Sequence, residues 1–357
     1  MLSDLRLSLR TLAKSRGFAL IAILTLAVGI GSTTAIFSAL RALVISPFHY
    51  PRADELVHVW SGDSWPLSPA DYLDLREQSS SFGAFGVYQP QSVNVGAENA
   101  QSVNAVAGTF DVLRAFGVQP MLGRFFEPAD DAVGAPPVVI LGEPLWQQLF
   151  GGDRSVIGRS LRLNGIDATI VGVMPRHFEF VSPWLRTTDC QLWLPLALHE
   201  NDIKRRDSHY LLGIARLRDG VNVATADAEI KTIGRRLAEL YPDSNTRKEF
   251  LVRPLRLEMT REVGAQVWTL FAAVALVLLV ACGNVASMLL ARSSRRQGEF
   301  GVRVALGASR ADLVRLALAE SLTLALLGAA LGLAVAFGGI EILRAISPAT
   351  DARKAAI

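Results

Sequence analysis

Cysteine is scarce in this sequence, which has only two among its 357 residues, Cys190 and Cys282. Cys282 lies inside a long apolar stretch and Cys190 does not, so we expect no disulfide between them, and no zinc-binding cysteine spacing is present. A G-x-x-x-x-G-K-[ST] phosphate loop and a G-x-S-x-G nucleophile elbow are also missing. The sequence therefore predicts no metal, no cofactor and no nucleotide bound through such a loop.

The five histidines are scattered along the chain: His49, His58, His177, His199 and His209. None of them forms the i, i+4 pair of a zinc-binding helix, and no paired carboxylates stand apart from ordinary charges on helix faces. A membrane-anchored hydrolase stays open as an alternative, but it needs a nucleophile–base pair that the sequence does not show. We therefore expect no catalytic residues and a chain that is not an enzyme.

Charged residues are absent from three long runs: Gly17–Leu40, Val263–Ala291 and Ser321–Ile340. An α-helix needs about 20 apolar residues to cross roughly 30 Å of hydrocarbon, and each run is long enough. The predicted transmembrane helices are residues 17–45, 263–291 and 321–343. The first could instead be a secretory signal peptide, but its apolar run exceeds the usual length of about 7–15 residues and no clear cleavage site follows, so we favour an uncleaved anchor.

Charges are distributed unevenly around these spans. Residues 1–40 carry four basic side chains and one acidic side chain, and residues 292–320 carry six basic and three acidic ones. Residues 42–262, by contrast, carry 22 basic and 27 acidic side chains. Basic residues in short loops mark the cytoplasmic side of a membrane, and long translocated domains escape that rule. We therefore expect a multi-pass protein of the bacterial inner membrane with a cytoplasmic N-terminus, a periplasmic segment 46–262 and no affinity for nucleic acid.

Residues 1–16 are predicted to form a cytoplasmic amphipathic helix. Four leucines recur at helical spacing, opposite basic residues: Leu2, Leu5, Leu9 and Leu12. Such a helix suits the headgroup region of the lipid, and packing on another protein is the alternative.

Two features inside the predicted spans concern helix packing. Gly29 and Gly31 begin a stripe of small residues, which lets a partner helix approach closely. The amide of Asn284 in the second span indicates an interhelical hydrogen bond or, alternatively, a polar contact in a pathway.

The pattern of residues 46–262 predicts an α+β domain inserted between the first two spans. Its strand-like runs are Glu55–Trp60, Pro137–Leu141, Ser160–Leu163, Ala168–Val173 and Leu211–Leu217. Asn164-Gly165 lies between two of these runs and predicts a hairpin. Predicted helices are Ser68–Glu77, Phe110–Phe116 and Val223–Leu240, the last with an apolar face of Ala226, Ile230, Ile233 and Leu237. The predicted fold class is an α-helical transmembrane protein with an inserted α+β extracytoplasmic domain.

The segment Ala291–Ser321, ARSSRRQGEFGVRVALGASRADLVRLALAES, is too polar to cross a membrane and too regular for a loop. Gly307-Ala308-Ser309 interrupts its helical pattern, and Ser309 suits the N-cap of a helix that restarts near Asp312. A cytoplasmic helix segment over residues 292–320 has the shape to receive movement from a soluble motor. The alternative is a basic linker held at anionic headgroups.

Part of this segment resembles a hallmark of the FtsX/MacB-type ABC transporter permeases. Their cytoplasmic stretch has the form R-x-x-E-[IF]-G-[IV]-R-x-A-L-G-A-x-R, and Arg296–Arg310 matches it in order. Leu5–Phe18 followed by Ala27–Gly31 is similar to the opening of the family's duplicated orphan permease branch, as is Phe48–Pro51. The predicted outer domain is similar to the MacB-type periplasmic core domain through short motifs: Ser68–Tyr72, Phe110–Leu113, Gly117–Pro120, Leu122–Arg124, Trp146, Ile157-Gly158, Leu163–Gly165, Val171–Pro175 and Trp193–Pro195.

The resemblance implies a permease subunit that couples ATP hydrolysis by a separate ABC ATPase to movement of a periplasmic domain, in efflux or envelope export. By their position in the motif, the residues that would contact the ATPase are Glu299, Gly301, Arg303, Leu306 and Gly307. The resemblance also implies a second permease unit, as a dimer partner or a duplicated half, and a partner in the periplasm.

The sequence departs from the family in its number of spans. Family permeases have four spans per unit, whereas this sequence has three, followed by a short tail over residues 344–357. We therefore expect a chain cut before a fourth span. The alternative function is a membrane-anchored periplasmic binding or scaffold protein that regulates an envelope partner without ATP.

Overall fold

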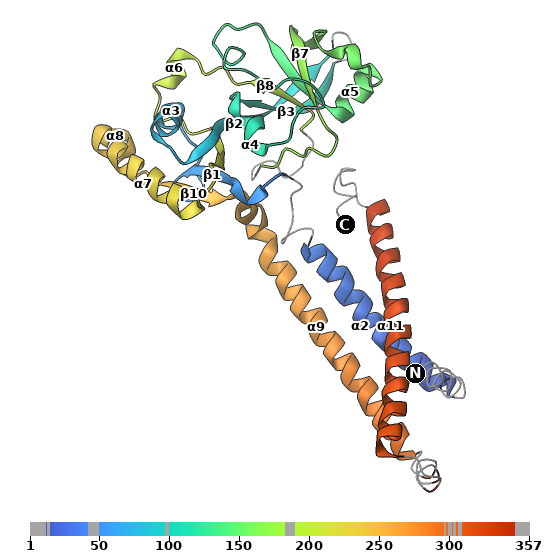
Figure 1. Cartoon of the computed structure of the whole chain (residues 1–357). Coiled ribbons are helices and arrows are strands. Elements are labelled where there is room, and N and C mark those ends of the chain that lie inside the picture. Colours follow the sequence, from blue (N-terminus) through green and yellow to red (C-terminus); the bar gives the residue numbers. More distant parts are fainter. Residues whose placement is uncertain are drawn as a thin grey trace. The chain divides into compact units, whose positions relative to one another are not determined.

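The computed structural model describes residues 12, 15–41, 50–96, 100–182, 190–295, 298, 302, 305 and 309–346. The chain divides into two compact units (Figure 1). We call Phe48–Arg261 the sheet unit, and Met1–Pro47 together with Glu262–Ile357 the helical unit. Each unit is described by itself.

The sheet unit is built on one mixed sheet in the order β10-β1-β9-β2-β3-β8-β5-β7-β4. Its strands are β1 (Leu56–Ser61), β2 (Phe82–Val95), β3 (Gln101–Gly108), β4 (Leu122–Gly123), β5 (Val138–Gly142), β6 (Ser160–Leu163), β7 (Ile166–Met174), β8 (Leu192–Pro195), β9 (Leu212–Leu217) and β10 (Phe250–Pro254). Only the β3–β8 and β5–β7 pairs are parallel among the described pairs. A mostly antiparallel sheet combined with short helices confirms the predicted α+β class.

Six strands of this sheet close into a ring. β6 forms a hairpin with β7 and also pairs with the end of β2, where Val95 lies opposite Leu163. The order β2-β3-β8-β5-β7-β6 therefore returns to β2. Asn164 and Gly165 connect β6 to β7 with φ values of 48° and 84°, which is the backbone that a two-residue hairpin turn needs, and the predicted hairpin is confirmed.

Short helices connect or cover the strands: α3 (Pro69–Gln78), α4 (Asp111–Phe116), α5 (Glu143–Phe150), α6 (Glu200–Ile203), α7 (Val223–Leu240) and α8 (Pro242–Asn245). The three predicted helices match α3, α4 and α7 to within one residue at each end. All four apolar positions predicted on α7 are buried, and they pack in one cluster with Phe250 and Val252 of β10. The buried face predicted for α7 from its helical periodicity is therefore confirmed.

Strand β1 is buried along its whole length. Leu56 and Trp60 belong to the apolar cluster on one side of the sheet, and Val57 and Val59 to the cluster on the other. Because side chains alternate along a strand, His58 faces the same side as Leu56 and Trp60. A titratable ring therefore lies in the interior of the sheet unit.

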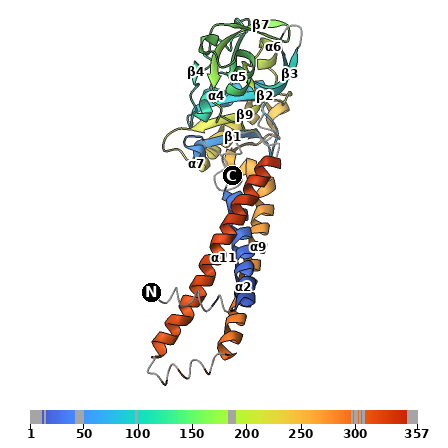
Figure 2. The same cartoon turned by 90° about the vertical axis from the view of Figure 1, so that its right-hand side faces the viewer.

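The helical unit contains the long helices α2 (Arg16–Leu40) and α11 (Arg310–Ile346) and all but the first two turns of α9 (Leu255–Arg295). Each includes a stretch long and apolar enough to cross a membrane: Arg16–Ser38, Gly264–Ser294 and Leu313–Gly338. The described part of the chain thus has three candidate spans, as predicted from the sequence. Figure 2 shows α2 beside α9 and α11, and contacts described below join it to both.

The boundaries of the third helix differ from the prediction. The sequence predicts a helix near Asp312 followed by a separate span from Ser321, but α11 runs from Arg310 through the span without a break. No glycine or proline lies between Ser309 and Ser321, so nothing in the sequence interrupts the backbone hydrogen bonds there. Ser309 precedes the helix, and its carbonyl oxygen accepts a hydrogen bond from the Leu313 N–H at 3.3 Å.

Candidate functional site

The five residues predicted to contact an ATPase lie outside the described residues: Glu299, Gly301, Arg303, Leu306 and Gly307. Val302, which lies between two of them, is helical and 61% exposed. The predicted site is followed in the chain by Ser309 and the first turn of α11. Its assignment stays a prediction.

Helices α2 and α11 cross at two glycines. A Cβ atom added to Gly31 would lie 2.8 Å from the carbonyl oxygen of Gly332, and one added to Gly332 would lie 2.7 Å from the carbonyl oxygen of Ala27. Both distances are too short for a real carbon–oxygen contact, so the two backbones touch directly. The small-residue stripe predicted on the first span therefore packs on a helix of the same chain, as expected.

Two more glycines extend this packing. A Cβ atom on Gly328 would lie 2.7 Å from Cβ of Leu26, and one on Gly29 would lie 2.9 Å from Cδ1 of Leu278 on α9. Asn284 of α9, by contrast, lies on an exposed face. Its side chain forms no hydrogen bond to another described helix, so the interhelical bond predicted for it is not made within this part of the chain.

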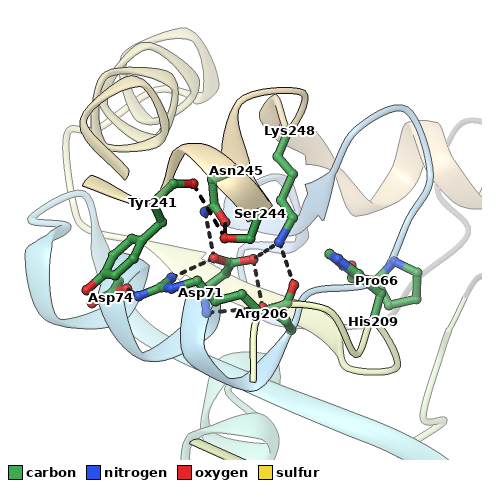
Figure 3. A network of polar contacts seen from close by, with 10 residues as sticks. Pro66, Asp71, Asp74, Arg206, His209, Tyr241, Ser244, Asn245 and Lys248 are labelled. Atoms are coloured by element: carbon green, nitrogen blue, oxygen red, sulfur yellow. Dashed lines mark hydrogen bonds and ion pairs between the residues drawn. The ribbon is translucent and has the colours of Figure 1, made fainter. Parts of the chain in front are cut away.

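The sheet unit contains a buried carboxylate with four donors, shown in Figure 3. Asp71 is fully buried. Its Oδ1 accepts hydrogen bonds from Arg206 and Asn245, both at 2.8 Å. Its Oδ2 accepts from Lys248 at 2.8 Å and from the Ser68 hydroxyl at 2.7 Å. Every favourable position around the two oxygens is therefore occupied.

This cluster joins three segments that are distant in the sequence. Asp71 and Asp74 lie on α3, Arg206 precedes β9, and Lys248 follows α8. Arg206 also pairs with Asp74 and stacks on the Tyr241 ring, its guanidinium carbon 3.6 Å from the ring centroid. Lys248 donates a second hydrogen bond to the Arg206 carbonyl oxygen at 2.6 Å. Since all charges are paired and enclosed, the cluster fastens these segments and offers no open position for a substrate.

The charge state of Asp71 follows from its partners. Burial raises the pKa of the Asp71 carboxyl. Hydrogen bonds from Lys248, Asn245 and Ser68, together with the charge of Lys248, lower this pKa by more than burial raises it, so the net pKa is below the ordinary 3.8. The carboxyl is therefore ionised at neutral pH. Because the pKa is lowered in the folded state, the stability it provides is present above about pH 4 and is lost as the pH falls below that value.

Sequence reasoning identified only one side of this cluster. Ser68–Tyr72 was singled out as a motif, and Ser68 caps α3 by accepting a hydrogen bond from the Asp71 N–H at 3.2 Å. Arg206, Asn245 and Lys248 were not predicted, because nothing local pairs them with a carboxylate more than 130 residues away. Within the described residues, no three histidine, cysteine or acidic side chains converge to hold a metal.

A second buried polar group lies on the other side of the sheet. His58 is stacked on Trp60, with ring centroids 5.5 Å apart, and meets the edge of Tyr88 at 6.5 Å. Neither ring nitrogen has a hydrogen-bond partner among the described residues. Burial lowers the pKa of His58 from 6.5 to about 3. The ring is therefore neutral in the folded protein at any pH above about 3.

We expect His58 to make the sheet unit sensitive to acid. Between pH 6.5 and 3 the unfolded chain binds a proton at this ring and the folded chain does not, so the free energy of unfolding falls as the pH falls. Between pH 7 and 5 the loss is about 2 kcal/mol. The variant His58→Phe removes this contribution, which urea unfolding at several pH values measures. The variant His177→Phe makes the same substitution at an exposed position and is the control for the exchange itself. An unchanged slope in His58→Phe contradicts the assignment.

Comparison with known proteins assigns most of the chain. Residues 19–233 match the MacB-like periplasmic core domain, and residues 271–353 match the FtsX-like permease C-terminal region. The chain is similar to the macrolide export ATP-binding/permease protein MacB of Burkholderia lata, with 25% identity over 80% of this chain and 39% of the relative. It is also similar to MacB of Rhodopseudomonas palustris, with 29% identity over 71% of this chain and 37% of that relative. It thus spans about two fifths of the length of these relatives.

Two solved structures of isolated domains are also similar to part of this chain. The periplasmic region of MacB from Actinobacillus actinomycetemcomitans is 17% identical, with a TM-score of 0.43 over 59% of this chain and 94% of that one. A domain of a permease protein from Porphyromonas gingivalis has a TM-score of 0.45 over 57% of this chain and 92% of that one. The core-domain match alone covers more than half of the residues. This chain therefore belongs to the FtsX/MacB-type permease family, with a MacB-like periplasmic core domain and an FtsX-like permease region.

Proposed function

We propose that this chain is the permease subunit of an ABC transporter, in which a separate ATPase moves the periplasmic domain. The observation that carries the proposal is the continuity of α11, which begins directly after the family's cytoplasmic motif and runs through the third span. A displacement applied at the motif would pass along one hydrogen-bonded helix. These 357 residues contain no phosphate loop, and we therefore place the hydrolysing site outside them.

The proposal places the chain in the bacterial inner membrane. Its segments are a cytoplasmic helix (1–16), three spans (17–45, 263–291 and 321–343), a periplasmic domain (46–262), a coupling segment (292–320) and a tail (344–357). The excess of basic residues in residues 1–40 and 292–320 supports this orientation. The relatives named above are macrolide exporters. By analogy we propose efflux or envelope export as the transport class, with a periplasmic partner.

A second permease unit is part of the proposal. Asn284, Gly283 and Ser287 lie together on the exposed face of the span in α9. An amide is costly in hydrocarbon unless another polar group satisfies it, and small neighbours let a second helix approach. This face is therefore suited to a helix of a dimer partner or a duplicated half.

The coupling contact is tested with two variants. Glu299→Lys reverses a charge in the motif, and Gly307→Trp adds bulk where the motif has none. We expect each variant to reduce ATPase stimulation to the rate of the ATPase alone, a loss of at least about tenfold, because the docking surface no longer fits. The measurement is ATP hydrolysis in proteoliposomes that contain the chain and the ABC ATPase that co-purifies with it.

The control for this experiment changes charge away from the motif. Asp207→Lys alters an exposed side chain of the sheet unit and keeps full stimulation. Membrane insertion of each variant is checked by alkaline extraction. If both motif variants stimulate normally, the coupling assignment fails, and the alternative of a periplasmic scaffold that works without ATP gains support.

A further inference from the structure

A pocket opens at one end of the closed ring of six strands. Its volume is about 260 Å³. Five of the six strands contribute a lining residue: Val93 from β2, Val138 from β5, Leu163 from β6, Ala168 from β7 and Leu194 from β8. These positions lie where β5 and β7 begin and where β6 and β8 end. Mouths of β-barrels are among the places where proteins bind small molecules.

Small side chains keep this end of the ring open. The loop before β5 contributes Ala132, Gly134 and Ala135, and the chain after β8 contributes Ala197. Deeper in the ring, larger residues such as Leu141 and Ile170 fill the interior. The ring is therefore packed in its middle and hollow at one mouth.

The lining of the pocket excludes a charged occupant. Asp130 is the only charged residue among those that line it. Its carboxylate is bound twice by Arg124, with Nη2 3.1 Å from Oδ1, and accepts the Glu127 N–H at 2.8 Å. The amide oxygen of Asn164 is likewise occupied by the Asn94 N–H at 2.9 Å. A charged group entering the pocket would lose its water and find no free counter-charge.

The size of the pocket limits the ligand. A dry cavity of about 150 Å³ is enough to bind benzene, and this pocket is larger. At about 30 Å³ per water-sized group it holds roughly nine such groups. Ile166, which lines the pocket at the start of β7, is 60% exposed. Its side chain continues the apolar lining to the surface, so a longer molecule can extend outside.

We propose that this pocket binds an uncharged small molecule through a single aromatic ring or an alkyl chain of about six to eight carbons. The site lies wholly in the sheet unit and does not depend on an ATPase. If the pocket binds no such molecule, the proposed coupling function is unaffected. If the coupling function is wrong, the proposed binding site is equally unaffected.

Disulfide tethering tests the proposal in the full chain in lipid nanodiscs. The variant Ala132→Cys places a thiol on the exposed loop beside the pocket. It is equilibrated, under excess 2-mercaptoethanol, with cystamine derivatives whose amines are benzoylated, hexanoylated, succinylated or free. We expect intact-mass spectra to show the benzoyl and hexanoyl adducts at least about tenfold enriched over the two charged adducts, because only the uncharged caps can enter the pocket.

Two further variants make the result specific. Ala228→Cys places the thiol on the exposed face of α7, and we expect less than a twofold preference there. The unsubstituted chain, with its own cysteines, is the blank. Ala132→Cys is also combined with Ala135→Trp or with the smaller Ala135→Leu. We expect either second substitution to fill the pocket and to remove the preference for uncharged caps. Equal adducts at both thiols, enrichment of a charged cap, or a preference that survives both filling variants would overturn the proposal.

Discussion

The variant Asp71→Asn is expected to lower the free energy of unfolding of the sheet unit by about 3–5 kcal/mol. The substitution keeps the shape of the side chain but removes the only negative charge shared by Arg206 and Lys248, whose side chains are 13% and 12% exposed. Arg206 would keep its pair with Asp74, but Lys248 would lose its carboxylate partner beside a second cation, with little water to screen it. Urea unfolding of the full chain in detergent, followed by near-ultraviolet circular dichroism, measures the loss.

A matched control separates burial from the loss of charge itself. Asp207→Asn removes the same charge from an exposed pair with Arg205, and no measurable change is expected. Adding Lys248→Met to Asp71→Asn removes one uncompensated cation, so part of the lost stability should return. Equal effects of Asp71→Asn and Asp207→Asn would show that the buried cluster does not fasten the sheet unit.

Local patterns in the sequence were sufficient for some elements. Asn164-Gly165 accepts positive φ at two successive positions, and α7 repeats its apolar residues at helical spacing. Both elements form because of their own residues, and both were predicted. In the membrane segments, the absence of charge over about 20 residues is an equally local signal.

The longest strand was not predicted because its pattern is weak. β2 runs from Phe82 to Val95, and its stretch Gln89–Ser92 is polar and includes Pro90. It forms because β9, β3 and the end of β6 supply hydrogen-bonding partners along its length. Of these partners only β3 is adjacent in the sequence, and β6 and β9 are distant, so the closed ring and its pocket could not be inferred from local pattern.

The buried cluster shows a similar limit. The Ser68–Asp71 cap is local and appears in the sequence as a motif, but a basic run such as Lys204–Arg206 is usually a solvated surface. Only the fold brings Arg206 under Tyr241 and against Asp71. In the third span, by contrast, Gly328 and Gly332 form a G-x-x-x-G pair, which is a local signal for the close crossing with α2.

The variant Gly332→Leu is expected to separate α2 from α11. Its Cβ would lie 2.7 Å from the Ala27 carbonyl oxygen and 3.1 Å from the Gly31 nitrogen, and backbone atoms of a helix cannot rotate away as a side chain can. Overpacking usually costs about 1–3 kcal/mol, and a backbone contact belongs at the upper end of this range. Titration with sodium dodecyl sulfate, followed by limited proteolysis of the helical unit, measures the loss. If the proposed coupling function holds, stimulation of the ATPase should fall with it, because α2 and α11 no longer pack.

Gly338→Leu is the control on the same helix. A Cβ at Gly338 would have no atom within 4 Å, and Gly338 is exposed, whereas Gly332 is buried. The two variants add the same side chain six residues apart, so any general effect of leucine on helix propensity or on membrane insertion is shared. A loss confined to Gly332→Leu therefore measures the crossing itself. If the two variants behave alike, close contact between α2 and α11 is not what holds the helical unit together, and the route from the coupling segment through α11 would need another partner helix.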